Sequence, residues 1–227
     1  MAHPQIAAFA RLAKENTPPV RSIQGQKTLI SRTIHGMSYD AIHDEIVTPS
    51  PFAQAILIFK GSANGDVAPK RVLSGPDTQI RPVRDLTGES PGQAHVDSKH
   101  NLLVVNSGGK ILIYDRMASG NAKPKAVISG VGASSGYNSF QISPKGWIIA
   151  GCDGGSICGW SLDENGQTTK RSKIPFLEIT GYQHSGIAID PTHKEVIFSA
   201  AAQRLPNPRP TSGIMNAVVT FSWPEVF

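Results

Sequence analysis

The sequence predicts an all-β fold built from repeated units of short strands, and three observations support this. The 227 residues include 22 glycines and 17 prolines, which favour many short elements joined by turns over long helices. The apolar stretches between these turns are short and rich in β-branched residues, as at 56–59 and 111–114. Two sets of residues also recur along the chain, which is the signature of a repeat fold.

The first repeat is an aromatic residue, an alanine, a proline and a glycine at offsets 0, 4, 10 and 16. Its three copies are Phe9, Ala13, Pro19 and Gly25; Phe59, Ala63, Pro69 and Gly75; and Tyr114, Ala118, Pro124 and Gly130. Agreement of four residue types in three gap-free segments indicates a real structural repeat.

The second repeat is an aspartate, a histidine three residues later, and an apolar pair. Its copies begin at Asp40, Asp97 and Asp190, and a degraded copy begins at Ser143. These anchors are separated by 57, 46 and 47 residues, a period typical of propellers and solenoids. We expect the histidines of this repeat, which are His43, His100 and His193, to be turn residues.

The apolar stretches place four strands in each unit, with units at 26–75, 76–130, 131–179 and 180–227 of a single domain, 1–227. The chain begins with a third and a fourth strand and stops after a third strand at 217–221. We therefore expect a β-propeller of four four-stranded blades, closed by an N-terminal strand from 1–25 that completes the last blade. One alternative is half of an eight-bladed dimeric ring. Another is that residues 6–14 form an amphipathic helix.

The repeats resemble those of NHL/YVTN-type β-propellers, in which an inner strand ends in Asp or Asp-Pro before a turn and an apolar strand. The segments 190–198, 101–106 and 111–115 carry this resemblance, which spans nearly the whole chain. It implies a fold and no particular activity. Rings of the family usually have six or seven blades, so four units imply a small closed ring, a half-ring that dimerises, or part of a longer protein.

Composition narrows the classes of partner. The net charge of +5 is spread along the chain and aromatic residues are 7%, so we expect no nucleic-acid binding. No apolar run is long enough for a membrane span and no export signal is recognisable, so we expect a soluble chain without assigning a compartment. Cys152 and Cys158 flank a turn, where they form either a disulfide or two buried thiols.

The leading functional hypothesis is a binding or scaffold module that recognises a small ligand or a protein partner at the mouth of the central channel. Loops on one face of a propeller gather there and commonly carry binding. The residues expected to line this mouth are Phe52, Gln54, Asn106, Asp153 and Arg204. Arg204 lies in the proline-rich segment 203–213, the least repeat-like part of the chain.

The alternative function is a divalent-metal-dependent lyase or hydrolase. His35, His95 and His184 fall at or just before the inner strands of three blades, where they could bind one divalent ion in the channel. His95 and His184 would then be the catalytic histidines, with one acting as general base. Resemblance to propeller lactonases implies such a site. The three histidines, however, lie 5, 2 and 6 residues before the aspartate of their repeat, so they are not in register. The competing interpretation is that they are hydrogen-bonded channel or loop residues.

Overall fold

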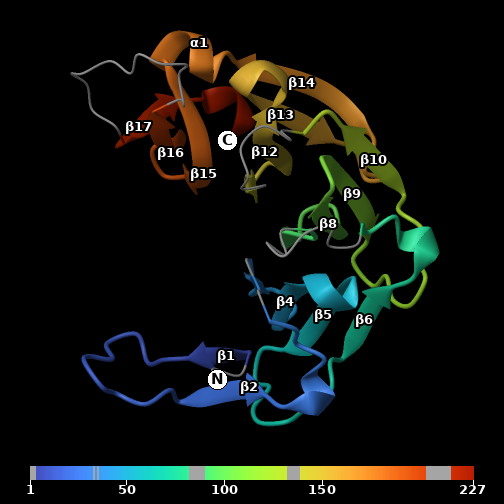
Figure 1. The fold of residues 1–227 in the computed structure, drawn as a ribbon. Helices are drawn as coiled ribbons and strands as arrows, with labels where there is room; N and C mark the ends of the chain where they lie inside the picture. Colours follow the sequence, from blue (N-terminus) through green and yellow to red (C-terminus); the bar gives the residue numbers. More distant parts are fainter. Residues whose placement is uncertain (1–3, 33, 35, 82–89, 132–138, 203–215) are drawn as a thin grey trace, which may run out of the picture.

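The computed structural model describes residues 4–32, 34, 36–81, 90–131, 139–202 and 216–227, which form five antiparallel sheets along an arc (Figure 1). Blade one is β3 (Ser38–Asp40), β4 (Glu45–Ser50), β5 (Ala55–Lys60) and β6 (Arg71–Ser74). Blade two is β7 (Gln93–Asp97), β8 (Leu102–Ser107), β9 (Lys110–Asp115) and β10 (Ala126–Ser129). Blade three is β11 (Phe140–Ile142), β12 (Trp147–Cys152), β13 (Ser156–Leu162) and β14 (Thr168–Ile174).

Two smaller sheets lie at the ends of the arc (Figure 1). The N-terminal sheet pairs β1 (Gln5–Ala8) with β2 (Arg21–Gln24), and the last blade contains β15 (Tyr182–Asp190), β16 (Glu195–Ala202) and β17 (Asn216–Ser222). The one α-helix of the described residues, α1 (Phe176–Thr180), precedes β15. Short 3₁₀ turns occupy Gln26–Thr28, Pro51–Ala53, Pro76–Thr78, Asp153–Gly155 and Pro224–Val226.

The prediction of four consecutive antiparallel strands per unit is confirmed for blades one to three, including the outer strand β14. The prediction that an N-terminal strand completes the last blade is wrong for the described residues, because β1 and β2 pair with each other. The helix over 6–14 is wrong as well, since β1 covers the start of that segment.

Contacts with blade one explain where the N-terminal sheet lies. Gly65 donates its N–H to the carbonyl of Ser22 at 2.7 Å and forms a parallel bridge with Ile23. One repeat later, Gly120 donates to the carbonyl of Val72 at 2.7 Å in the same way. The N-terminal sheet therefore occupies the position of the outer half of a blade that precedes blade one.

Hydrophobic clusters fill each space between neighbouring sheets, and each contains an aromatic residue from the third strand of the following sheet. Phe59 packs with Ile6 and Ile23 of the N-terminal sheet, whereas Tyr114 packs with blade one. Trp160 packs with blade two, and Phe221 packs with blade three. Close packing of this kind holds the arc together from one end to the other.

The inner strands β3, β7, β11 and β15 follow one another along the concave side of the arc (Figure 1). Side chains link them: Ser38 donates to the carbonyl of Ala94 at 2.7 Å, and Gln93 accepts the N–H of Phe140 at 3.0 Å. Gln141 then donates to the carbonyl of Ile187 at 3.1 Å. These bonds fix each inner strand relative to the next.

The second repeat forms one turn, built in the same way in three blades. In each copy the aspartate Oδ2 lies 2.6 Å from the histidine Nδ1, and Oδ1 accepts backbone N–H groups of the turn. The prediction that His43, His100 and His193 are turn residues is confirmed. In blade three the degraded copy has Gly146, and a Cβ there would lie 2.2 Å from Cε1 of His100. The histidine of blade two thus takes the space beside this glycine.

Cys152 and Cys158 form a disulfide across the β12–β13 hairpin, with a Cα–Cα distance of 5.8 Å. Of the two alternatives that the sequence left open, the bonded one is correct. Within the described ranges, no helix is long and apolar enough to cross a membrane.

Candidate functional site

The turns that join the second and third strands of each blade lie on one face of the arc, here called the turn face. Each turn contacts the connection that enters its own blade. Arg32 lies over the ring of Phe52 in blade one, and Ser107 accepts the N–H of Arg81 in blade two. In blade three, Val131 of the entering connection forms an antiparallel bridge with Cys152, which precedes the turn. The sequence correctly expected turns and connections to share a face.

Phe52 is the most prominent apolar side chain of the predicted set. It is 41% exposed on the 3₁₀ turn Pro51–Ala53, and the Arg32 guanidinium lies 5.2 Å from the centre of its ring. Gln54 ends this turn in the left-handed region, with φ 49°, and is half-buried. An aromatic ring beside a guanidinium offers an apolar contact and a charged donor within one small area.

The other three predicted mouth residues differ in their placement. Asp153 is exposed on the turn of blade three. Asn106 is 1% exposed at the end of β8, so it lies beneath the surface and does not line an open mouth as the sequence suggested. Arg204 lies outside the described residues. Sequence position identified the turns correctly but did not reveal which side chains point inward.

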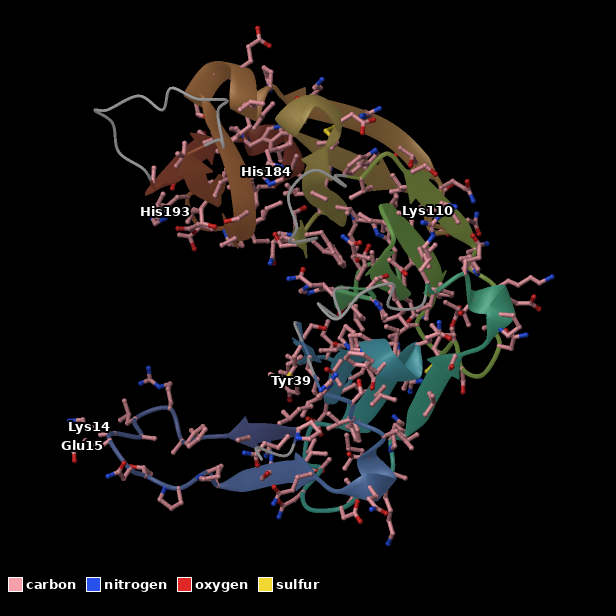
Figure 2. The ribbon with its side chains drawn as sticks, in the orientation of Figure 1. Lys14, Glu15, Tyr39, Lys110, His184 and His193 are labelled. Carbon is pink, nitrogen blue, oxygen red and sulfur yellow. A yellow bond between two sulfur atoms is a disulfide. The ribbon has the colours of Figure 1, made fainter. Side chains whose placement is uncertain are left out.

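The histidines of the metal hypothesis pack against different aromatic rings. The ring of His95 contacts Phe140 edge-on at 4.7 Å, and burial lowers the pKa of His95 to about 4. His184, which is labelled in Figure 2, is 4% exposed beside Phe176, and burial also lowers the pKa of this histidine. Both are neutral imidazoles near pH 7.

His35 lies outside the described residues, so the full set of three histidines is not placed. Among the residues that the structure does place, no group of three His, Cys, Asp or Glu side chains lies close enough to hold one ion.

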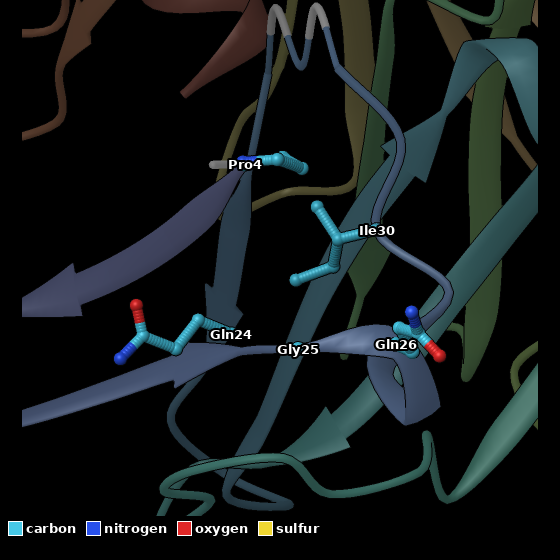
Figure 3. A pocket seen from close by; sticks show the side chains of 5 residues that line it. All are labelled: Pro4, Gln24, Gly25, Gln26 and Ile30. Atoms are coloured by element: carbon cyan, nitrogen blue, oxygen red, sulfur yellow. The ribbon is translucent and has the colours of Figure 1, made fainter. Parts of the chain in front are cut away.

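A pocket that the sequence did not predict opens where the N-terminal sheet meets the connection into blade one (Figure 3). It has a volume of about 480 Å³ and is lined by Pro4, Gln24, Gly25, Gln26 and Ile30. The pocket is close to the Phe52 turn along the chain, because Ile30 of the pocket lining is two residues from Arg32, which contacts Phe52. Ser31, between them, donates its N–H to Oγ of Ser50 at 3.0 Å, which ties the pocket wall to the end of β4. The sequence identifies Gly25 only as a repeat position and does not indicate a pocket there.

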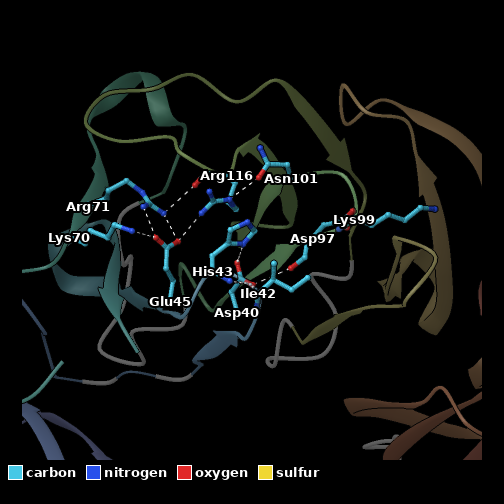
Figure 4. Close-up of polar contacts among 11 residues, drawn as sticks. Asp40, Ile42, His43, Glu45, Lys70, Arg71, Asp97, Lys99, Asn101 and Arg116 are labelled. Carbon is cyan, nitrogen blue, oxygen red and sulfur yellow. Dashed lines mark hydrogen bonds and ion pairs between the residues drawn. The ribbon is translucent and has the colours of Figure 1, made fainter. Parts of the chain in front are cut away.

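A buried ion cluster lies at the opposite end of the strands from the turn face (Figure 4). Glu45, at the start of β4, is 1% exposed and binds the Arg71 guanidinium through two oxygens, each at 2.8 Å. Lys70 donates to the same carboxylate at 2.7 Å, and Arg116 of blade two also donates to it, at 3.1 Å. Arg116 is held in turn by Asn101, at 2.7 Å.

The electrostatic consequence for Glu45 is large. The hydrogen bonds from Arg71 and Lys70 lower the pKa of Glu45 to about 2, against the opposing effect of burial. Bidentate arginine–carboxylate pairing is among the strongest polar contacts in proteins. The cluster joins blade one to blade two. The sequence indicated only a dense basic pair at Lys70 and Arg71, because its acidic partner is far away in the chain.

No protein-family model matches the chain, and no curated protein sequence matches it. Solved structures do match. A chain of the mitotic checkpoint complex is 16% identical over 83% of this chain, with a TM-score of 0.55, and the Dos1 propeller is 12% identical over 85%, with a TM-score of 0.56. The chain has a β-propeller-like fold. A Bacteroides uniformis protein with a provisional 6-phosphogluconolactonase name matches over 82%, at 16% identity and a TM-score of 0.55.

The chain spans about half the length of these propellers: it covers 50% of the checkpoint chain, 47% of Dos1 and 54% of the Bacteroides protein. At these identities the likeness concerns the fold alone, and it assigns no activity or partner to this chain.

Proposed function

We propose that the chain is a binding or scaffold module that recognises its partner on the turn face of blade one. The observation that carries this proposal is the exposed Phe52 ring beside the Arg32 guanidinium, next to a pocket of about 480 Å³. Aromatic and arginine side chains are enriched at the centres of binding interfaces. A ligand that suits both groups carries a carboxylate close to an apolar or aromatic group. Either a small molecule or a partner's peptide segment supplies that chemistry.

The site has the features of a preorganised surface. The Phe52 turn follows β4, which is wholly buried, and Ser50 at the end of that strand donates to the carbonyl of Leu29 at 3.0 Å. Leu29 is itself 50% exposed and directly precedes Ile30, which lines the pocket. Groups held on a rigid element lose less conformational entropy on binding.

NMR titration of the ¹⁵N-labelled chain tests this proposal. The probes are 3-phenylpropionate, as a small aryl carboxylate, and a short peptide containing Phe-Glu. We expect amide shifts to concentrate at residues 29–32 and 50–54. Phe52→Ala and Arg32→Ala should each weaken binding about tenfold, the loss of roughly 1.4 kcal/mol.

Ile42→Ala is the matched control, because Ile42 is 74% exposed on a turn at the opposite end of the same blade. Binding to this control should equal binding to the wild type. Shifts elsewhere on the chain, or equal binding by all three variants, would contradict the proposed site. If only the peptide binds, the partner is a protein; if phenylpropionate binds as well, small ligands are included.

We further propose that residues 1–227 form one domain related to NHL/YVTN-type propellers. Hydrophobic clusters join every pair of consecutive sheets, and the Asp–His turns recur with the same geometry. Both features support a continuous arc of one repeat type. Limited proteolysis should then leave no stable fragment of one or two blades, whereas release of such a fragment would contradict a single domain.

The metal-dependent lyase or hydrolase is the second candidate, with His35, His95 and His184 as ligands. It is supported by the likeness to the Bacteroides protein and by the neutral state of His95 and His184, since a neutral imidazole is the form that binds metal. Equilibrium dialysis against Zn²⁺ or Ca²⁺, followed by elemental analysis, tests it. One ion retained per chain, and lost in His95→Ala, would support the candidate; equal metal content in the two proteins would contradict it.

A further inference from the structure

The interface between consecutive sheets has a direction, because in every case the third strand of the following sheet contributes an aromatic residue to it. Phe59, Tyr114 and Trp160 stand at the same place in the third strand of blades one, two and three, and they are 1%, 0% and 3% exposed. Each packs on the preceding sheet. Phe9 is the copy of this residue in the N-terminal sheet, since the pairing of Ala8 with Arg21 repeats that of Ile58 with Arg71.

Phe9 is 56% exposed, unlike its copies. Within the described residues no sheet precedes the N-terminal sheet, so the surface on which this ring would pack is supplied by nothing in the arc. Ala7, which shares its face of the strand, corresponds to the fully buried Leu57 and is itself only half-buried. This end of the arc therefore presents the aromatic half of an interface between sheets.

The opposite end presents the receiving half. In blade one, the surface that receives Tyr114 includes Val47, Ile56 and Ile58, which are at most 1% exposed. The pair of Val47 and Ile58 in blade one corresponds to the pair of Ile197 and Thr220 in the last blade. In each pair, the first residue follows the aspartate of the second repeat by seven residues.

This equivalence assigns the matching positions of the last blade to Ile197, Val218 and Thr220. Val218 is 75% exposed where Ile56 is 0%, and Thr220 is also exposed. No following sheet covers this face in the described part of the chain. Each end of the arc thus carries the surface that the other end requires.

We propose that two copies of this chain associate head to tail, with Phe9 and Ala7 of one copy packed on Ile197, Val218 and Thr220 of the other. The proposal is independent of the ligand site on the turn face. A head-to-tail interface forms either a closed ring or an open filament. A closed pair is favoured by size, because one chain covers 47% to 61% of the propellers that it resembles, so two arcs are comparable in size to one complete ring.

The proposed interface is more polar than those inside the chain. Gln5 replaces Ala55 of blade one, and Ser22, which donates to Oε1 of Gln5 at 3.1 Å, replaces Val72. A less apolar face binds its partner less tightly, so we expect association in the micromolar range and not permanent assembly.

Sedimentation velocity of the full chain across the micromolar range tests the proposal. The expected result is a concentration-dependent rise from one to two chain masses. Phe9→Glu and Val218→Glu should each abolish this rise, because either change buries an unpaired charge in the interface. Ile42→Glu is the matched control, since Ile42 is 74% exposed and does not lie at either end of the arc. This variant should associate like the wild type. Unchanged circular dichroism shows that each variant is folded.

Cysteine pairing tests the orientation separately. A mixture of Phe9→Cys and Val218→Cys chains should form a crosslinked pair under mild oxidation, while neither variant alone should do so. A monomeric mass at every concentration would overturn the proposal, as would association that survives both glutamate substitutions. Crosslinking of either cysteine variant with itself would overturn the head-to-tail arrangement.

Discussion

Glu45→Gln removes the charge from the buried cluster between blades one and two while keeping the size of the side chain. The pKa of Glu45 is lowered from 4.5 to about 2 by the hydrogen bonds of Arg71 and Lys70. At 1.36 kcal/mol per pKa unit, this difference corresponds to about 3 kcal/mol of folding free energy at neutral pH. Removal of one partner from a buried ion pair costs a similar amount, roughly 3–5 kcal/mol. We therefore expect the variant to be about 3 kcal/mol less stable at pH 7.

The pH dependence has a defined sign. Because the folded state holds the pKa of Glu45 below its value in the unfolded chain, the contribution is complete above pH 4.5 and is lost as pH falls towards 2. A protonated Glu45 resembles glutamine in charge, so the stabilities of the wild type and the variant should converge near pH 2. Urea unfolding of both proteins at several pH values measures the difference and cancels the titration of other carboxylates.

Glu164→Gln serves as the matched control, because Glu164 is exposed on the turn between β13 and β14. Its stability should stay within about 0.5 kcal/mol of the wild type. The reasoning would be refuted if Glu45→Gln were as stable as the wild type at pH 7. It would also be refuted if the difference between the two proteins were the same at pH 7 and at pH 2.

Two further predictions concern the packing of blade three. Replacement of both Cys152 and Cys158 by alanine should lower the free energy of unfolding by about 2 kcal/mol, the entropy of a short closed loop, as measured by urea denaturation; a double variant as stable as the wild type would contradict this. Gly146→Ala should destabilise by roughly 1–3 kcal/mol, because the new Cβ would lie 2.2 Å from Cε1 of His100 and φ is +79°. Gly120→Ala is its control, with φ +60° and no atom within 4 Å of the new Cβ, and the thermal unfolding midpoint should fall less in this variant than in Gly146→Ala.

The strands and turns of the fold were predictable because they depend on residues that are close together in the sequence. An aspartate followed by a histidine three residues later forms its turn from neighbouring atoms, so the pattern alone identified the turns at Asp40 and Asp97. The closing strand was not predictable in the same way. Strand order along the chain is compatible with pairing at either end of the arc, and the contact that decides it, between Ser22 and Gly65, joins different repeat units.

The features of the candidate site are likewise of two kinds: those that local sequence determines and those that depend on contacts between distant segments. The sequence placed Phe52 on an accessible turn, because the turn belongs to the repeat. It did not reveal the Arg32 contact, the pocket or the burial of Asn106, since each depends on segments that meet only in the folded chain. The partners of Glu45 could not be predicted from the sequence for the same reason, as Arg116 lies 71 residues away.

The two ends of the strands in blade one have separable roles, and this gives the proposals a common test. Glu45 stabilises the junction with blade two at one end, while Phe52 presents a ring at the other, with the buried strand β4 between them. Glu45→Gln should therefore lower the free energy of unfolding without weakening phenylpropionate binding under conditions where the chain stays folded. Phe52→Ala should weaken binding and leave stability nearly unchanged, because its ring is 41% exposed. A loss of binding in Glu45→Gln would show that the turn face depends on the ion cluster, and the two ends would then have to be treated as one coupled unit.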